Sequence, residues 1–262
     1  MDENYFKHNA LSQSTLKKYL VSRRKAKEET IISREARIGG YIIEDALFGG
    51  FDRLHKKYAV DKYKTYCKSM SETNEEGRIN VTQDHWDMAA AAINASENEQ
   101  RFQRLLRNTE LCGEEQVELY YQRDGIECKA KLDYLLTNEK TNNYLIIDIK
   151  SWSPQGDISV EALSYHCKKF KYDFQAAWYI DALKRAKNLG DESSVSFVNL
   201  FIDKSESPEF IWAAISDINL QHAERDIEKA IEVYKDEESK TFMDNHCDDV
   251  FIELNWWVNE YE

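Results

Sequence analysis

The central part of the chain alternates hydrophobic and polar residues with the period of β-strands. This pattern predicts strands over Leu111 to Tyr121, Ile126 to Leu136, Tyr144 to Ser151, Val195 to Ile202 and Phe210 to Ile215. The first two flank Arg123-Asp-Gly125, which is typical of a hairpin turn. The second and third flank a polar turn over residues 137–143, so we expect them to pair antiparallel.

Other segments repeat their hydrophobic positions with the period of helices. Helices are predicted from Ser12 or Ser14 to about Ser22, over Arg34 to Phe48, over Val81 to Ser96 with a further helix to about Arg107, and over Ile158 to His166, Tyr172 to Ala186 and Asp217 to Glu238. Ser12 or Ser14, and Thr82, are candidate N-caps. An extended aromatic segment is expected over Asp248 to Trp257. With 262 residues, the chain has the size of one α/β domain.

The predicted strand from Tyr144 to Ser151 carries an acid and a base near its end. Asp148 and Lys150 project from one face, and Ile147 and Ile149 project from the other. An antiparallel neighbour can bring Asp133 beside Asp148. Because two adjacent carboxylates repel and offer hard oxygen ligands, the pair indicates a site for Mg²⁺ or Mn²⁺.

Two helices carry further polar residues. Gln175 and Tyr179 lie one turn apart on one helix face, with Tyr172 one turn earlier, and can present an amide and a phenol to one ligand. Glu44 lies on an early helix that begins near Ala36-Arg-Ile-Gly-Gly40.

Together these motifs resemble the PD-(D/E)xK nucleases, in the order that their RecB-like branch shows. Asp133 matches the family's first acid, although Leu132 stands where the family often has proline, and Asp148-Ile-Lys150 matches the (D/E)xK motif. Gln175 and Tyr179 match Gln-x-x-x-Tyr, and Glu44 takes the early acidic or imidazole position. Leu11-Ser12-Gln-Ser14-Thr-Leu16, Cys128 to Asp133 and Lys169 to Tyr179 resemble RecE-type recombination exonucleases, also called exonuclease VIII.

The resemblance implies a restriction-endonuclease-like α/β core, with a central mixed β-sheet flanked by helices. Asp133 and Asp148 would bind Mg²⁺ or Mn²⁺ with the carbonyl of Ile149 and Glu44, and Lys150 would stabilise charge. Gln175, Tyr179 and Tyr172 would position the substrate, and Ser12 or Ser14 is a candidate 5′-phosphate contact beside its capping role. The resemblance also implies 5′-to-3′ digestion of linear duplex DNA, a RecT-type annealing partner and a ring-shaped homo-oligomer.

We expect a single exonuclease domain over residues 1–262: a mainly helical part over 1–110, the sheet core over 111–216 and an acidic C-terminal part over 217–262. No long apolar run or secretory signal is present, so we expect a cytoplasmic protein without membrane contact. The five cysteines are scattered, which argues against a disulfide framework, a zinc site or an iron–sulfur cluster.

The formal net charge of −13 is unusual for a protein that binds DNA. The acids are concentrated from Asp217 to Glu262, where 14 acidic residues accompany 4 basic ones. Basic residues outnumber acidic ones over 1–30, 52–68 and 168–187, which can line a DNA path or form solvated helix faces.

Three alternatives remain open from the sequence. The chain could be another RecB-like nuclease, either a repair endonuclease or a Cas4-like end processor without its cluster. It could keep the nuclease fold for binding alone, or it could be an acidic α/β interaction module with no nucleic-acid role.

Overall fold

The computed structural model describes residues 3–21, 26–27, 33–61, 71–153 and 157–239. The extended segment predicted over Asp248 to Trp257 and the cysteines Cys67 and Cys247 lie outside these ranges. Within them, no helix combines the length and the hydrophobicity that crossing a membrane requires.

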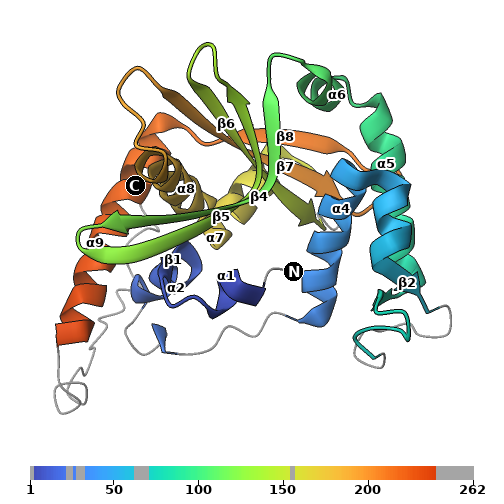
Figure 1. The fold of residues 1–262 in the computed structure, drawn as a ribbon, viewed down its shortest axis with the longest axis horizontal. Coiled ribbons are helices and arrows are strands. Elements are labelled where there is room, and N and C mark those ends of the chain that lie inside the picture. Colours follow the sequence, from blue (N-terminus) through green and yellow to red (C-terminus); the bar gives the residue numbers. More distant parts are fainter. Residues whose placement is uncertain (1–2, 22–25, 28–32, 62–70, 154–156, 240–262) are drawn as a thin grey trace, which may run out of the picture.

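A mixed β-sheet organises the fold (Figure 1). Its main path runs in the order β1 (Leu11–Ser12), β5 (Ile126–Asn138), β6 (Asn143–Trp152), β7 (Ser194–Asp203) and β8 (Phe210–Ala214), and β4 (Cys112–Arg123) pairs with β5. The pairs β1–β5 and β6–β7 are parallel, and the pairs β4–β5, β5–β6 and β7–β8 are antiparallel. The central mixed sheet predicted from the sequence is confirmed.

The sheet forks at the middle of β5. Strand β6 pairs with β5 only as far as the pair Tyr134 and Ile147, whereas it stays beside β7 through Trp152. Further back along β5, Cys128 and Lys129 pair with β1. Because β4 follows β5 almost from end to end, β1 and β6 share its other edge and leave an unpaired stretch between them.

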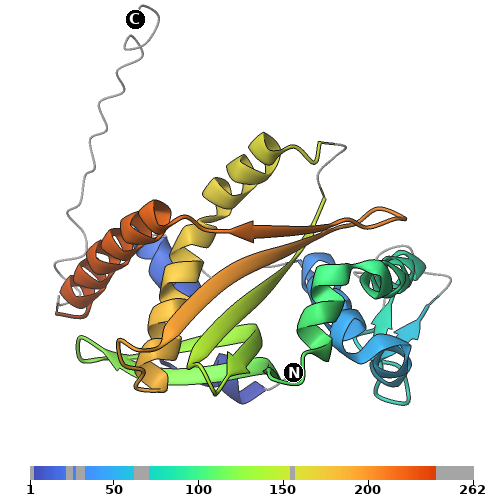
Figure 2. The ribbon, with the colours of Figure 1, turned by 90° about the horizontal axis from the view of Figure 1, so that it is seen from above.

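Helices cover both faces of the sheet (Figures 1 and 2). On one side lie α2 (Gln13–Tyr19), α8 (Tyr172–Ala186) and α9 (Asp217–Ser239); on the other lie α4 (Arg34–Lys57), α5 (Gln83–Asn98) and α6 (Gln100–Arg107). Side chains of β6 point alternately to the two faces of the sheet and so contribute to the hydrophobic cluster on each face. Ile146 packs in the cluster that contains Trp178 of α8, and Ile147 packs in the cluster that contains Ile43 of α4.

The smaller elements complete the arrangement. They are α1 (Glu3–Lys7), the parallel pair β2 (Tyr58–Val60) and β3 (Ile79–Val81), and α7 (Val160–Phe170), which precedes α8. The hydroxyls of Ser12 and Thr82 accept N-cap hydrogen bonds at the starts of α2 and α5, as predicted.

Two predicted helix ends are wrong: the helix predicted to end at His166 continues as α7 to Phe170, and the helix that carries Glu44 is also longer than predicted. The helix predicted to end at Phe48 continues as α4 to Lys57, through a kink at Gly50. Gly50 has φ 57° and ψ −161°, a conformation that only glycine adopts readily, so the chain bends there and resumes its helix.

Candidate active site

Asp133 and Asp148 lie at the fork of the sheet. Continuing the register of β5 and β6 by one residue past Tyr134 and Ile147 places the two aspartates opposite each other. The main-chain amide of Ile149 donates to Asp133 Oδ2 over 2.8 Å. Because the ladder stops here, a carboxylate takes the donor that would otherwise extend it. The structure therefore brings together the two acids that the sequence pairs.

Asp148 is held by partners on its own side of the sheet. It is 1% exposed, forms an ion pair with Lys150 and accepts a 2.8 Å hydrogen bond from Gln175 Nε2 on α8. The same amide also donates to the Tyr179 hydroxyl over 3.1 Å. Gln175 and Tyr179 share the predicted helix face, and both are buried against Asp148. Through these bonds they orient the acid.

Lys150 lies between Asp148 and Tyr172. Its ammonium is 5.2 Å from the centre of the Tyr172 ring, a cation–π distance. Burial alone would lower the pKa of Lys150, but the nearby charges of Asp148 and Asp133 outweigh burial and raise the pKa. Lys150 is therefore a protonated cation beside the two acids.

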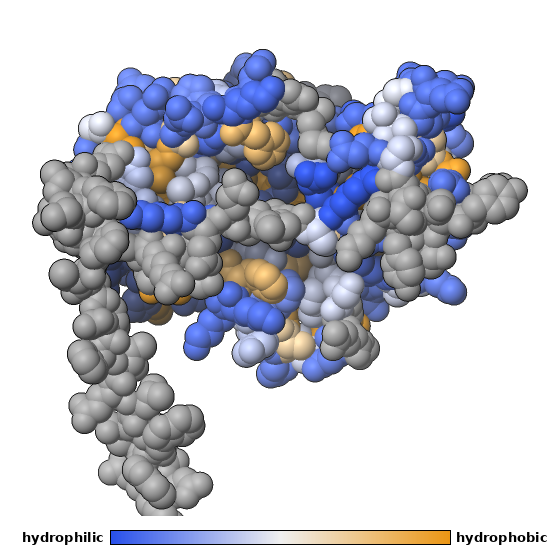
Figure 3. Space-filling model, turned by 90° about the horizontal axis from the view of Figure 1, so that it is seen from below, coloured by the Kyte–Doolittle hydropathy of each residue, from blue (hydrophilic) through white to orange (hydrophobic). Residues whose placement is uncertain are grey.

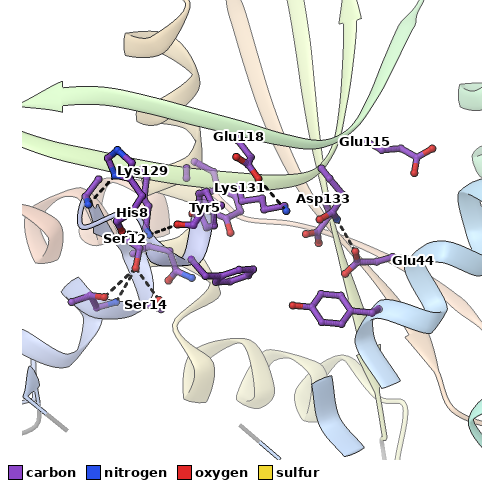
Figure 4. Close-up of a pocket in the computed structure, with 18 of the residues that line it drawn as sticks. Tyr5, His8, Ser12, Ser14, Glu44, Glu115, Glu118, Lys129, Lys131 and Asp133 are labelled. Atoms are coloured by element: carbon purple, nitrogen blue, oxygen red, sulfur yellow. Dashed lines mark hydrogen bonds and ion pairs between the residues drawn. The ribbon is translucent and has the colours of Figure 1, made fainter. Parts of the chain in front are cut away.

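Glu44 approaches from the opposite helical layer, on α4 (Figure 4). Its Oε2 accepts a 2.7 Å hydrogen bond from Gln116 Nε2 on β4. Gln116 is the residue of β4 opposite Asp133, yet it is missing from the ladder and has a left-handed φ of 53°. Sequence reasoning missed Gln116, because a glutamine between strand residues carries no signal for this conformation.

The acids of the site repel one another in a partly buried place. Burial, followed by the charges of Asp133 and Asp148, raises the pKa of Glu44 to about 9. Burial, followed by the charge of Asp148, raises the pKa of Asp133 to about 7. A positive charge placed between these groups would favour their ionised forms.

The donor set fits a hard divalent cation held mainly by two carboxylates. Asp133 and Asp148 supply oxygen donors on neighbouring strands, and Mg²⁺ is commonly bound by one or two carboxylates together with water. Across the described residues, no three acidic, histidine or cysteine side chains are placed to hold one ion. Glu44, bound to Gln116, is thus not yet in a shared ligand set with the two aspartates.

A cleft of about 1010 Å³ opens beside the acids, between α4, β4, β5 and the N-terminal segment. Glu44 and Asp133 line one part of it, and Ser12 and Ser14 line another (Figure 4). Tyr179 also lines the cleft. The Ser12 hydroxyl lies 3.0 Å from that of Ser14 and accepts from the amide of Thr15 over 3.4 Å. Ser12 is therefore a helix cap that also faces the cleft.

Two lysines of β5 line the cleft, and both have partners. Lys129 is 7% exposed and donates to the carbonyls of Tyr5 and His8, each over 2.7 Å, which ties α1 to the sheet. Lys131 forms a 3.3 Å ion pair with Glu118.

The face of the molecule seen from below is mainly hydrophilic, with separate hydrophobic patches (Figure 3).

Comparisons with known proteins give the family and the fold of this chain. Residues 47–252 match the model of a family described as a PDDEXK-like domain of unknown function (DUF3799). A crystal structure from Eubacterium rectale, of a protein provisionally described as an exonuclease, superposes with a TM-score of 0.60 at 16% identity, covering 97% of this chain and 95% of the other. The match shows a shared fold.

A phage-related exonuclease from Haemophilus somnus 129PT also matches, with a TM-score of 0.35 at 12% identity over 90% of this chain and 98% of the other. That similarity is too low to support an argument. No curated protein matches this chain.

Proposed function

Since the chain belongs to the PDDEXK-like family, we propose that it is a divalent-metal-dependent deoxyribonuclease that digests linear duplex DNA from its ends. The observation that supports this proposal best is the convergence of Asp133, Asp148 and Lys150 at the fork of the sheet, next to a large cleft. Metal-dependent cleavage of a phosphodiester needs acids that hold the metal, and a cation that offsets charge on the phosphate assists it.

Asp133 and Asp148 would hold Mg²⁺ or Mn²⁺, with the Ile149 carbonyl as a further ligand and Glu44 joining after it leaves Gln116. When bound, the ion supplies a Lewis acid that polarises the scissile phosphate and acidifies a water molecule. Gln175 keeps the Asp148 carboxylate oriented through its 2.8 Å bond. Lys150 remains protonated and offsets negative charge that develops on the phosphate.

The decisive experiment compares a linear duplex with the same DNA as a covalently closed circle, with Mg²⁺ present. We expect nucleotides to be released from the linear form and the circle to stay intact. Asp148→Asn and Lys150→Ala should each lower the rate by about 100-fold or more. Asp191→Asn, at an exposed position remote from the motifs, is the matched control.

Nicking of the circle would show that the activity is that of an endonuclease and not of an exonuclease. Equal release by wild type and the site variants would assign the cleavage to another protein in the preparation. Binding of DNA without any cleavage would instead support a nuclease fold kept for binding.

We further propose that the enzyme is RecE-like, with 5′-to-3′ polarity, a RecT-type annealing partner and a homo-oligomeric state, and that residues 1–262 act as one exonuclease domain. Ser12 or Ser14 would contact the 5′-phosphate from the wall of the cleft. Duplexes labelled at either 5′ or 3′ ends test the polarity. Duplexes with a 5′-phosphate or a 5′-hydroxyl test the serines, because Ser14→Ala should reduce the preference for phosphate.

A further inference from the structure

A row of aromatic rings leads outward from Lys150 along the junction of α7 and α8. Lys150 lies over the ring of Tyr172, and Tyr172 is stacked with Phe170, with ring centres 5.9 Å apart and planes 18° apart. The Phe170 ring in turn lies 4.6 Å from that of His166. The row therefore joins a candidate catalytic lysine to the surface.

The junction that holds these rings is well defined. Helix α7 ends at Phe170, and the left-handed φ of 51° at the next residue, Lys171, lets the chain turn into α8. The ammonium of Lys17 on α2 donates to the Phe170 carbonyl over 3.1 Å. Phe170 and Tyr172 are consequently placed by the backbone on either side of a fixed turn.

The outer end of the row is exposed and basic. Phe170 is 47% exposed and Tyr165 on the same helix is 70% exposed. Lys168 and Lys169 are exposed beside them, on the helix face that also carries Tyr165. In the part of the chain that the structure describes, neither lysine is joined to a carboxylate by an ion pair. Figure 2 shows α7 next to one end of α8, at the edge of the molecule.

Ordinary core packing accounts for the inner rings alone. Trp152, Leu163 and Phe201 form a buried cluster beneath α7, and Tyr172 is packed against it. Phe170 and Tyr165 lie outside that cluster and keep much of their surface exposed, and the ammonium of Lys169 lies 5.6 Å from the centre of the Phe170 ring. Exposed rings interleaved with lysines are the usual features of a surface that binds single-stranded nucleic acid.

We propose that Tyr165, Lys168, Lys169 and Phe170, here termed the α7 platform, bind the unpaired part of a DNA strand next to the active site. This proposal rests on the proposed nuclease function and specifies the form of its substrate. An aromatic face can stack on a base only when that base is free of its partner strand, whereas lysines bind phosphates of either form. The platform would therefore favour single-stranded DNA over duplex DNA.

The test is a binding measurement that needs no cleavage. Fluorescence anisotropy would follow the full-length protein with a labelled oligothymidine and with a blunt duplex of equal length, in EDTA. We expect Phe170→Ala to weaken binding of the oligothymidine at least about fivefold and to leave duplex binding within about twofold. Phe170→Trp should restore the affinity, since it keeps a stacking surface.

Matched controls separate the platform from general effects. Phe51→Ala removes another exposed ring, on α4, and should change neither affinity. Lys168→Ala with Lys169→Ala should weaken binding of the oligothymidine, while Lys184→Ala with Lys187→Ala, at exposed positions near the far end of α8, should not.

Equal affinity of wild type and Phe170→Ala for the oligothymidine would overturn the platform. Light scattering gives the oligomeric state of Tyr165→Ala and Phe170→Ala. If these variants change the oligomeric state and leave DNA binding unchanged, the proposal is overturned and the surface is a protein contact. These results are independent of the cleavage assay, so the platform and the nuclease proposal can fail separately.

Discussion

One residue at the fork of the sheet, Gln116, has a backbone conformation that glutamine rarely adopts. Gln116 has a left-handed backbone on a strand, at the position opposite Asp133, and its side chain reaches Glu44. A non-glycine residue in this region costs about 1–3 kcal/mol and persists where the surroundings hold it. The strained residue thus lies where β4 meets the candidate site.

Replacing Gln116 by glycine tests whether strain is stored there. Gln116→Gly removes both the cost of the left-handed conformation and the hydrogen bond to Glu44, which are of similar size, so we expect the free energy of unfolding in urea to stay within about 0.5 kcal/mol of wild type. Gln122→Gly, at an exposed position of the same strand with ordinary backbone angles, should lose about 1 kcal/mol. An equal loss in both variants would contradict stored strain.

Whole elements follow the sequence closely where one period dominates. Helix α8 begins and ends at the predicted residues, and α9 ends one residue beyond its prediction. The antiparallel pairing of β5 and β6 follows from their turn and suffices to place Asp133 beside Asp148. The contact between Glu44 and Gln116 joins residues 72 positions apart, and no local pattern encodes the approach of α4 to β4.

Replacing either of two glycines of α4 by alanine should change the free energy of unfolding, in opposite directions for the two positions. Gly50 has a left-handed φ, so Gly50→Ala is expected to lower the free energy of unfolding by about 1–3 kcal/mol. Gly40 lies in the regular helix with no atom within 4 Å of an added Cβ, so Gly40→Ala should raise it by about 0.5–1 kcal/mol. Urea titrations of both variants measure the difference, and shifts of the same sign would contradict the kink.

At the scale of the whole molecule, the net charge does not describe the charges around the candidate site. The net charge of −13 suggests a protein that repels DNA, yet the cation Lys150 is paired with Asp148 at the fork of the sheet, next to the cleft that Asp133 lines. Sequence reasoning located the acids and left open whether the basic segments line a DNA path or form solvated helix faces. It could not foresee that Lys129 and Lys131 are used internally, because their partners lie in α1 and β4.

The stability of the metal-free protein should fall as pH rises from about 4 to about 7. The pKa of Asp133 is raised from 3.8 to about 7, so in this window the folded chain keeps a proton that the unfolded chain has released. Glu44, whose pKa is raised to about 9, contributes to the same slope. Thermal unfolding in EDTA measures the slope, and Asp133→Asn should reduce it without removing it.

Mg²⁺ should reverse this loss at pH 8. An ion at about 100 times its dissociation constant adds roughly 2.7 kcal/mol to the folded state. Parallel pH curves for wild type and Asp133→Asn, or an equal gain from Mg²⁺ in both, would show that Asp133 is not the group responsible.

The fork of the sheet has a consequence for ion selectivity. Asp133 and Asp148 are attached to two strands that part at this point, so the gap between their carboxylates is determined by how far the main chains diverge. Side-chain rotation adjusts that gap only slightly, because the amide of Ile149 and Gln175 hold the two groups. Discrimination between a small ion such as Mg²⁺ and a larger one such as Ca²⁺ would then be a property of backbone spacing, and packing beneath the strands would tune it from a distance.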